Sequence, residues 1–76
     1  MSNREYISYS TATLELLEDN FVSRQAWPED TYVFMDNDII YKVNNIATIP
    51  WYAEQEDYRA QDWYLINKED LRLRGN

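Results

Sequence analysis

The chain contains no cysteine and no histidine, and its one glycine stands near the end, at position 75. Disulfides, zinc centres with Cys or His ligands, and catalysis that pairs a Ser or Cys nucleophile with His are therefore excluded. A phosphate-binding loop is excluded as well, because such a loop needs several glycines close together. We therefore assign no metal, no cofactor and no catalytic residue, and expect a binding protein rather than an enzyme.

Basic residues are also scarce, with 7 Lys and Arg against 14 Asp and Glu and a net charge of -7. Because non-specific binding to DNA or to anionic membranes depends on clustered basic side chains, we expect neither as a partner. No run approaches the ~18 apolar residues of a membrane-spanning helix, and the first residues contain no apolar signal segment. These absences predict a cytoplasmic protein whose partner is a small ligand or another protein.

The length of 76 residues predicts one domain over 1–76, with a core from about residue 10 to 66 and a polar tail at 67–76. So small a core rarely supplies more than about 3–5 kcal/mol of stability, and neither a disulfide nor a metal adds to it. The chain nevertheless has three tryptophans, seven tyrosines and two phenylalanines. We infer aromatic contacts with another subunit or a ligand, and expect a homo-oligomer.

Hydrophobic spacing predicts an α+β domain, with one N-terminal helix packed on a small antiparallel sheet of four to five strands. The helix is expected from Thr11 to about Asn20, with Ser10 or Thr11 as its N-cap and its apolar positions at Leu14, Leu17 and Phe21. Extended segments are expected at 22–27, 31–35, 39–43, 46–49 and 63–66, with one helical turn within 54–62 and a meander over 31–49. Because glycine is almost absent, we expect asparagines at the left-handed turn positions.

Acidic side chains raise two further possibilities. The segment Asp36-Asn37-Asp38 begins like a calcium-binding loop, but Ile40 occupies the third ligand position, so a hairpin turn is the favoured interpretation. Carboxylate pairs such as Asp57 and Asp62 are the groups that glycosidases use as acid and base. No pair stands out as a poised acid and base, so a phosphodiesterase is disfavoured.

The three tryptophans, Trp27, Trp51 and Trp63, stand at or near breaks in the regular pattern, and Arg24 precedes the first of them. A tryptophan face stacks on a nucleobase for about 1–3 kcal/mol, and an arginine holds phosphate oxygens with two parallel hydrogen bonds. Other interpretations stay open, because the tryptophans also suit a core or a subunit interface and Arg24 also suits a surface ion pair. Trp63, within an apolar strand pattern, fits the core best.

Three short patterns follow one another along the chain, namely Val22-x-Arg24-x-x-Trp27, Pro50-Trp51 and Asp57-x-x-Ala60-x-Asp62-Trp63. Their order and spacing resemble the Thoeris anti-defence sponges, a family of short phage proteins that sequester cyclic nucleotide immune signals. The resemblance covers roughly residues 10 to 66. It implies an α+β protomer that assembles as a homotetramer and binds cyclic ADP-ribose isomers at subunit junctions, with cyclic dinucleotides as a further class of ligand in some members.

The resemblance also implies the residues of a ligand site. By position, Trp27 stacks on a base, Arg24 meets phosphate or braces the loop, and Trp51, Gln55 and Asp57 lie near the pocket. The family commonly has a longer segment where this chain runs from Met35 to Ile46, which implies lost ligand contacts or a changed preference of signal.

One interpretation of another class stays open. An acidic protein–protein inhibitor that mimics nucleic acid and blocks a host defence nuclease also suits a small, acidic, aromatic-rich chain. Its carboxylates cluster in two segments, at Glu15, Glu18 and Asp19 and at Glu54, Glu56 and Asp57. This interpretation leaves Arg24 and the tryptophans at the loop edges unexplained.

Overall fold

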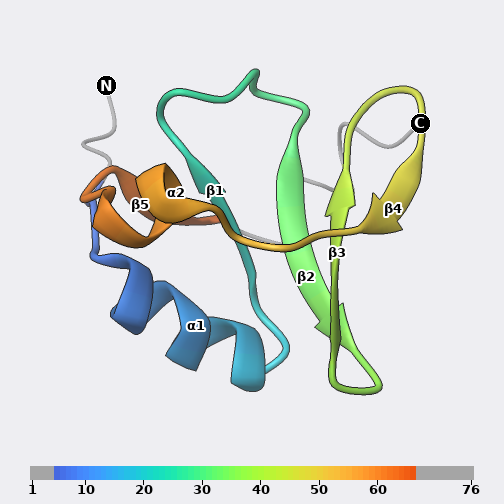
Figure 1. Ribbon diagram of the computed structural model, residues 1–76, viewed down its shortest axis with the longest axis horizontal. Coiled ribbons are helices and arrows are strands. Elements are labelled where there is room, and N and C mark those ends of the chain that lie inside the picture. Colours follow the sequence, from blue (N-terminus) through green and yellow to red (C-terminus); the bar gives the residue numbers. More distant parts are fainter. Residues whose placement is uncertain (1–4, 67–76) are drawn as a thin grey trace.

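The computed structural model describes residues 5–66, which form a five-stranded sheet, one longer helix and one short helix (Figure 1). In chain order the elements are α1 (Tyr9–Leu17), β1 (Phe21–Arg24), β2 (Tyr32–Asp36), β3 (Ile39–Val43), β4 (Thr48–Pro50), α2 (Gln55–Arg59) and β5 (Trp63–Ile66). The α+β class and the number of strands predicted from the sequence are confirmed. The polar tail predicted at 67–76 lies outside the described residues.

The strands lie in the order β4-β3-β2-β1-β5, and every neighbouring pair is antiparallel. The predicted meander is confirmed by β2, β3 and β4. The chain then returns to the opposite edge of the sheet, where β5 pairs with β1 and Arg24 lies opposite Trp63. This return brings the pattern around residue 24 and the pattern around residue 62 together, although they are far apart in the sequence.

The helix α1 begins and ends earlier than the sequence predicted. Its N-cap is Ser8, whose hydroxyl accepts a hydrogen bond from the Thr11 N–H at 3.3 Å, so the prediction of Ser10 or Thr11 as N-cap is wrong. The apolar face was also predicted wrongly, because Ala12 and Leu16 are buried, four residues apart on one face. Leu14 and Leu17, which the sequence pattern favoured, are exposed.

The left-handed positions are only partly those predicted. Within residues 5–66, three residues other than glycine have a positive φ, namely Asp19 (66°), Asn37 (53°) and Asp38 (66°). Asn37 confirms the prediction for the hairpin between β2 and β3. The other two are aspartates, whose short polar side chains tolerate this region for the same reason as asparagine.

The core lies on one face of the sheet, under α1 and under the segment from β4 to α2. Its buried residues are Ala12, Leu16, Val22, Val33 and Trp63. Trp63 is only 1% exposed, as the sequence favoured. Figure 1 shows the link between β4 and α2 crossing the sheet, where the Trp51 N–H donates to the Ile40 carbonyl at 2.8 Å. Neither helix of the described chain has the length and apolarity that crossing a membrane requires.

Candidate functional site

The three tryptophans form one cluster in which each ring meets the other two at an angle. The ring centroids of Trp27 and Trp63 are 5.2 Å apart, and each lies 5.9 Å from the centroid of Trp51. Trp63 is buried at the base, whereas Trp27 and Trp51 are half-buried. The buried ring therefore holds the two outer rings in a fixed orientation, and part of each outer ring stays accessible.

Arg24 lies beside this cluster at the end of β1 and is only 8% exposed. Its Nε donates to Asp62 Oδ1 at 2.9 Å, and its Nη1 donates to Asp57 Oδ1 at 3.0 Å. Burial acts to lower the pKa of Arg24, but the hydrogen bonds and charges of Asp62 and Asp57 outweigh burial and raise this pKa. Arg24 therefore stays charged, and its charge is matched by carboxylates of the chain itself.

Asp57 connects the short helix α2 to this network. Its Oδ2 accepts a hydrogen bond from the Glu54 N–H at 2.8 Å, while its Oδ1 accepts from Arg24. The indole N–H of Trp63 donates to the Asp57 carbonyl at 3.1 Å. A helix of five residues has little stability by itself, so these contacts hold α2 against the tryptophan cluster.

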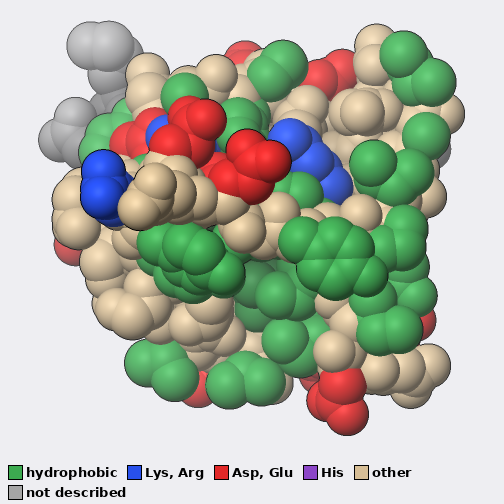
Figure 2. Space-filling view, viewed as in Figure 1, with side chains coloured by type: hydrophobic (Ala, Val, Ile, Leu, Met, Phe, Trp, Pro, Cys, Tyr) green, Lys and Arg blue, Asp and Glu red, His purple; other side chains and the backbone are tan. Residues whose placement is uncertain are grey.

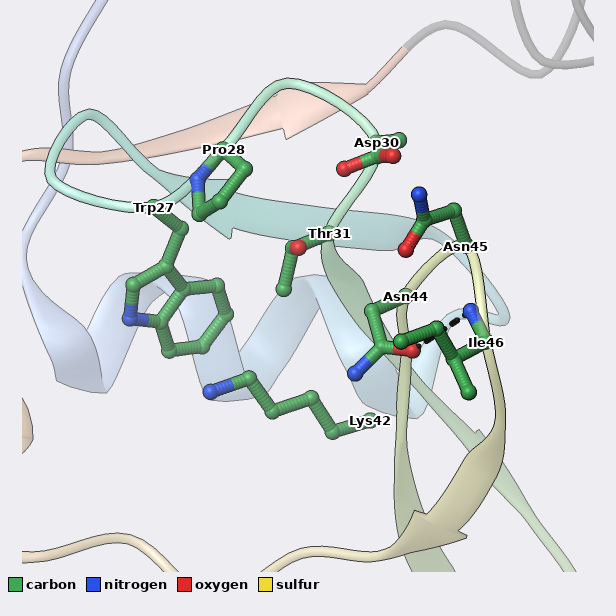
Figure 3. A pocket seen from close by; sticks show the side chains of 8 residues that line it. All are labelled: Trp27, Pro28, Asp30, Thr31, Lys42, Asn44, Asn45 and Ile46. Atoms are coloured by element: carbon green, nitrogen blue, oxygen red, sulfur yellow. Dashed lines mark hydrogen bonds between the residues drawn. The ribbon is translucent and has the colours of Figure 1, made fainter.

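Two cavities meet at Trp27 and Lys42. One, which we call the tryptophan cavity, has a volume of about 340 Å³, and its lining includes Arg24, Trp27, Lys42, Trp51, Glu56 and Asp57. The other, which we call the loop cavity, has a volume of about 450 Å³ and lies between the β1–β2 and β3–β4 loops (Figure 3). Its lining includes Trp27, Thr31, Lys42, Asn44, Asn45 and Ile46.

Comparison with known families matches residues 7–66 to the Thoeris anti-defense 2-like (Tad2-like) domain. The chain belongs to the Thoeris anti-defense 2-like family. The match spans all the helices and strands of the described chain and confirms the resemblance seen in the sequence. It assigns the protein a Thoeris anti-defense role. No curated protein matches the chain.

This Thoeris anti-defense 2-like chain brings together four of the five site residues that the resemblance implied. Arg24, Trp27, Trp51 and Asp57 all line the tryptophan cavity. Gln55, the exposed first residue of α2, does not line it. The hydrogen bonds of Arg24 correspond to the second of its two expected roles, which was to brace the loop.

Lys42 is the main site residue that the sequence analysis missed. It lies opposite Val33 in the register of β2 and β3, so its side chain leaves the sheet on the face that carries the core. Its ammonium lies 4.2 Å from the centre of the Trp27 ring, which is a cation–π contact. The signal in the sequence is a lysine in phase with Ile40, at a position where period-two alternation predicts an inward side chain.

Charge is distributed unevenly around the two cavities. Figure 2 shows acidic side chains gathered over α2, close to basic ones, above a broad area of hydrophobic side chains. Glu54, Glu56 and Asp57 line the tryptophan cavity, whereas Asp30 is the one carboxylate in the lining of the loop cavity. Within residues 5–66, no three Asp or Glu side chains are grouped so that they could hold a metal ion.

Proposed function

We propose that the protein binds a cyclic nucleotide immune signal in the host cytoplasm and sequesters it without cleavage. The ligand is a cyclic ADP-ribose isomer or a cyclic dinucleotide. The observation that carries this proposal is the tryptophan cavity, in which two accessible indole rings stand beside buried and charged hydrogen-bonding groups. Stacking one base contributes about 1–3 kcal/mol, and a nanomolar complex needs about -12 kcal/mol, so polar contacts supply the rest.

Each residue of the site has a separate role in this proposal. Trp27 stacks on a base, and Trp51, in the link between β4 and α2, borders the same cavity. Arg24 and Asp57 keep the two tryptophans and α2 in position through their buried hydrogen bond. Gln55, exposed at the start of α2, contacts the ligand from the rim. A site that is rigid before binding loses little entropy on binding, which favours tight capture.

Sequestration without cleavage is supported by the state of the carboxylates. Asp62, one member of the pair that the sequence left open as acid and base, accepts from Arg24 Nε and from the Ala26 N–H at 3.2 Å. The other member, Asp57, accepts from Arg24 and from the Glu54 N–H. Both carboxylates are therefore engaged with donors of the chain itself rather than held toward a ligand as a general acid and base.

We further propose that the protein assembles as a homotetramer with its ligand sites at subunit junctions. Ile46 and Tyr52 are 88% and 83% exposed, more than any other large hydrophobic residue in the described chain. Ile46 lines the loop cavity and Tyr52 lines the tryptophan cavity. Covering these rims with another copy buries apolar surface at roughly 25 cal/mol per Å² and encloses a ligand on its open side.

Acidic mimicry of nucleic acid receives less support. A mimic needs an exposed face of carboxylates, but Asp57 is buried and Glu15 accepts a hydrogen bond from the Asn20 amide at 2.8 Å. The two acidic segments seen in the sequence therefore expose fewer free carboxylates than the number of their Asp and Glu residues suggests. The tryptophan cavity has no role in such a protein.

Calorimetric titration tests the proposed function. Cyclic ADP-ribose isomers and cyclic dinucleotides are titrated separately into the protein, and the bound ligand is released and chromatographed. We expect saturable sub-micromolar binding, recovery of the intact ligand, loss of binding in Trp27→Ala and partial binding in Trp27→Phe, which keeps an aromatic ring. Absence of heat with every probe refutes the proposal and leads to capture of a protein target. Recovery of a cleaved ligand refutes sequestration.

A further inference from the structure

The part of the tryptophan cavity around Arg24 is a poor place for a negative charge. Glu54, Glu56 and Asp57 line it, and its arginine already pairs with Asp57 and Asp62, with Glu56 at 3.7 Å from Nη1. Three carboxylates therefore lie within ion-pair distance of one guanidinium. A phosphate placed beside Arg24 gains no free positive charge and is repelled by the carboxylates, whereas the hydroxyl and amino groups of a nucleoside are well matched to them.

Lys42 differs from Arg24 in the groups that surround its charge. Among residues 5–66, no carboxylate lies within ion-pair distance of its ammonium, which contacts the Trp27 ring instead. It lines both cavities and is half-buried between them. Figure 3 shows its side chain reaching from β3 toward Trp27 along the boundary of the loop cavity.

Asn44 adds a neutral donor on the same side. Its Oδ1 accepts hydrogen bonds from the Ile46 N–H at 2.8 Å and from the Ala47 N–H at 2.9 Å. These two bonds fix the orientation of the amide, and Figure 3 shows its Nδ2 turned toward the cavity, on the side of Lys42. An ammonium and an amide N–H₂ group thus face the same space, and both can donate to phosphate oxygens.

We propose that Lys42 and Asn44 bind the anionic group of the ligand in the loop cavity, while a base of the ligand stacks in the tryptophan cavity next to it. This inference rests on the proposed function and assigns an orientation to the bound ligand. Because the ammonium now lies over the indole, binding exchanges one partner for another: the base takes the face of Trp27 and Lys42 turns to the phosphate. Lys42 is then the residue that selects phosphate-bearing ligands over plain nucleosides.

A matched pair of variants tests the role of Lys42. Lys42→Gln and Arg59→Gln each remove one positive charge, but Arg59 is exposed on α2 and lines neither cavity. Calorimetry uses the cyclic nucleotide probe that binds the wild type most tightly, at low and high salt. We expect Lys42→Gln to weaken binding about 10- to 100-fold and to reduce the salt dependence. We expect Arg59→Gln to change affinity less than about twofold, and Lys42→Arg to retain most of it.

Asn44→Asp gives a second, independent test. Asp keeps the oxygen that accepts from Ile46 and Ala47, so the loop keeps its turn, but it replaces the donor by an anionic oxygen. Unchanged thermal unfolding with affinity at least tenfold weaker supports the proposal. If the wild type binds while Lys42→Gln and Asn44→Asp bind equally well at every salt concentration, the anion lies elsewhere and only this inference fails. If the wild type binds none of the probes, the proposed function fails and this inference with it.

Discussion

Arg24 and Asp57 are 33 positions apart in the sequence and are joined by a buried hydrogen bond of 3.0 Å between Nη1 and Oδ1. Because Asp62 accepts from Nε of the same guanidinium, one side chain connects β1, α2 and the start of β5. These are the three elements that position the tryptophan cluster. The site is therefore held by an ion-pair network centred on Arg24, whose removal leaves the buried Asp57 without its cationic partner.

Replacement of Arg24 tests this network. Arg24→Met leaves the buried Asp57 carboxylate without its cationic partner, and we expect a loss of about 3–5 kcal/mol in the free energy of unfolding. Arg24→Lys should also destabilise, because one ammonium cannot reproduce the two directed bonds from Nε and Nη1. Urea denaturation followed by tryptophan fluorescence measures both. The exposed Arg59→Met serves as control and should stay within about 0.5 kcal/mol of the wild type. A loss below about 1 kcal/mol in Arg24→Met contradicts a structural role.

The cap of α1 is tested by Ser8, which is the N-cap in the structure, and by Ser10, which the sequence pattern favoured. Ser8→Ala removes the hydroxyl that accepts from the Thr11 N–H and should cost about 1 kcal/mol of stability. Ser10→Ala lies within the helix, where alanine is the most favourable residue, and should be neutral or slightly stabilising. The difference between the unfolding midpoints of the two variants in urea shows which serine caps α1. Equal losses in both variants would mean that Ser8 is not the cap.

The strands and the meander of β2, β3 and β4 were largely predictable, because β2, β3 and β5 are apolar runs separated by turn residues, whereas the pairing of β5 with β1 was not predicted. The start of α1 was not predictable, since Ser8, Ser10 and Thr11 are all suitable caps and only tertiary packing selects among them. Packing against Val22 and Trp63 favours the register in which Ala12 and Leu16 face the sheet. In the sequence, Leu14 and Leu17 were a stronger hydrophobic signal than Ala12, yet Ala12 is the buried residue.

The candidate site was predictable where residues near in the sequence act together, as for Trp27 and its loop. It was not predictable where strand register decides. Period-two alternation predicts that Lys42 faces inward, but its place beside Trp27 depends on its pairing with Val33 and on the link after β4 crossing the sheet, and neither follows from local pattern. Asp57 and Asp62 were likewise named as a pair from the sequence. The sequence does not show that both bind the guanidinium of Arg24.

The stability of the protein at alkaline pH should depend on Tyr9. Burial, and next the neighbouring Tyr58 and Asp57, raise the pKa of Tyr9 above its ordinary value of 10.0. The unfolded chain therefore releases this proton at a lower pH than the folded protein, so the stabilisation is complete below pH 10.0 and is lost as the pH rises through the folded pKa. Tyr9→Phe keeps the ring contacts with Tyr58 and Trp63 but lacks the proton.

Denaturation of the wild type and Tyr9→Phe at several pH values from roughly 9 to 11 measures this effect. The free energy of unfolding should fall more steeply with pH in the wild type than in the variant. Parallel curves would show that the phenol titrates alike in the folded and unfolded chains.

The proposed assembly is tested at the rim of the loop cavity. Ile46→Ser removes an apolar side chain that is 88% exposed, and Leu14→Ser makes the same kind of change at a residue that is 61% exposed on α1 and lines neither cavity. If copies meet at the cavity rims, sedimentation velocity over a range of concentrations should show a lower average mass for Ile46→Ser only, because burial of a large aliphatic side chain contributes about 1.5–3 kcal/mol to each contact. Ligand affinity should fall in the same variant, since the second copy closes the site. A tetramer that forms equally in both variants contradicts this placement of the interface, and a monomeric wild type refutes the assembly itself.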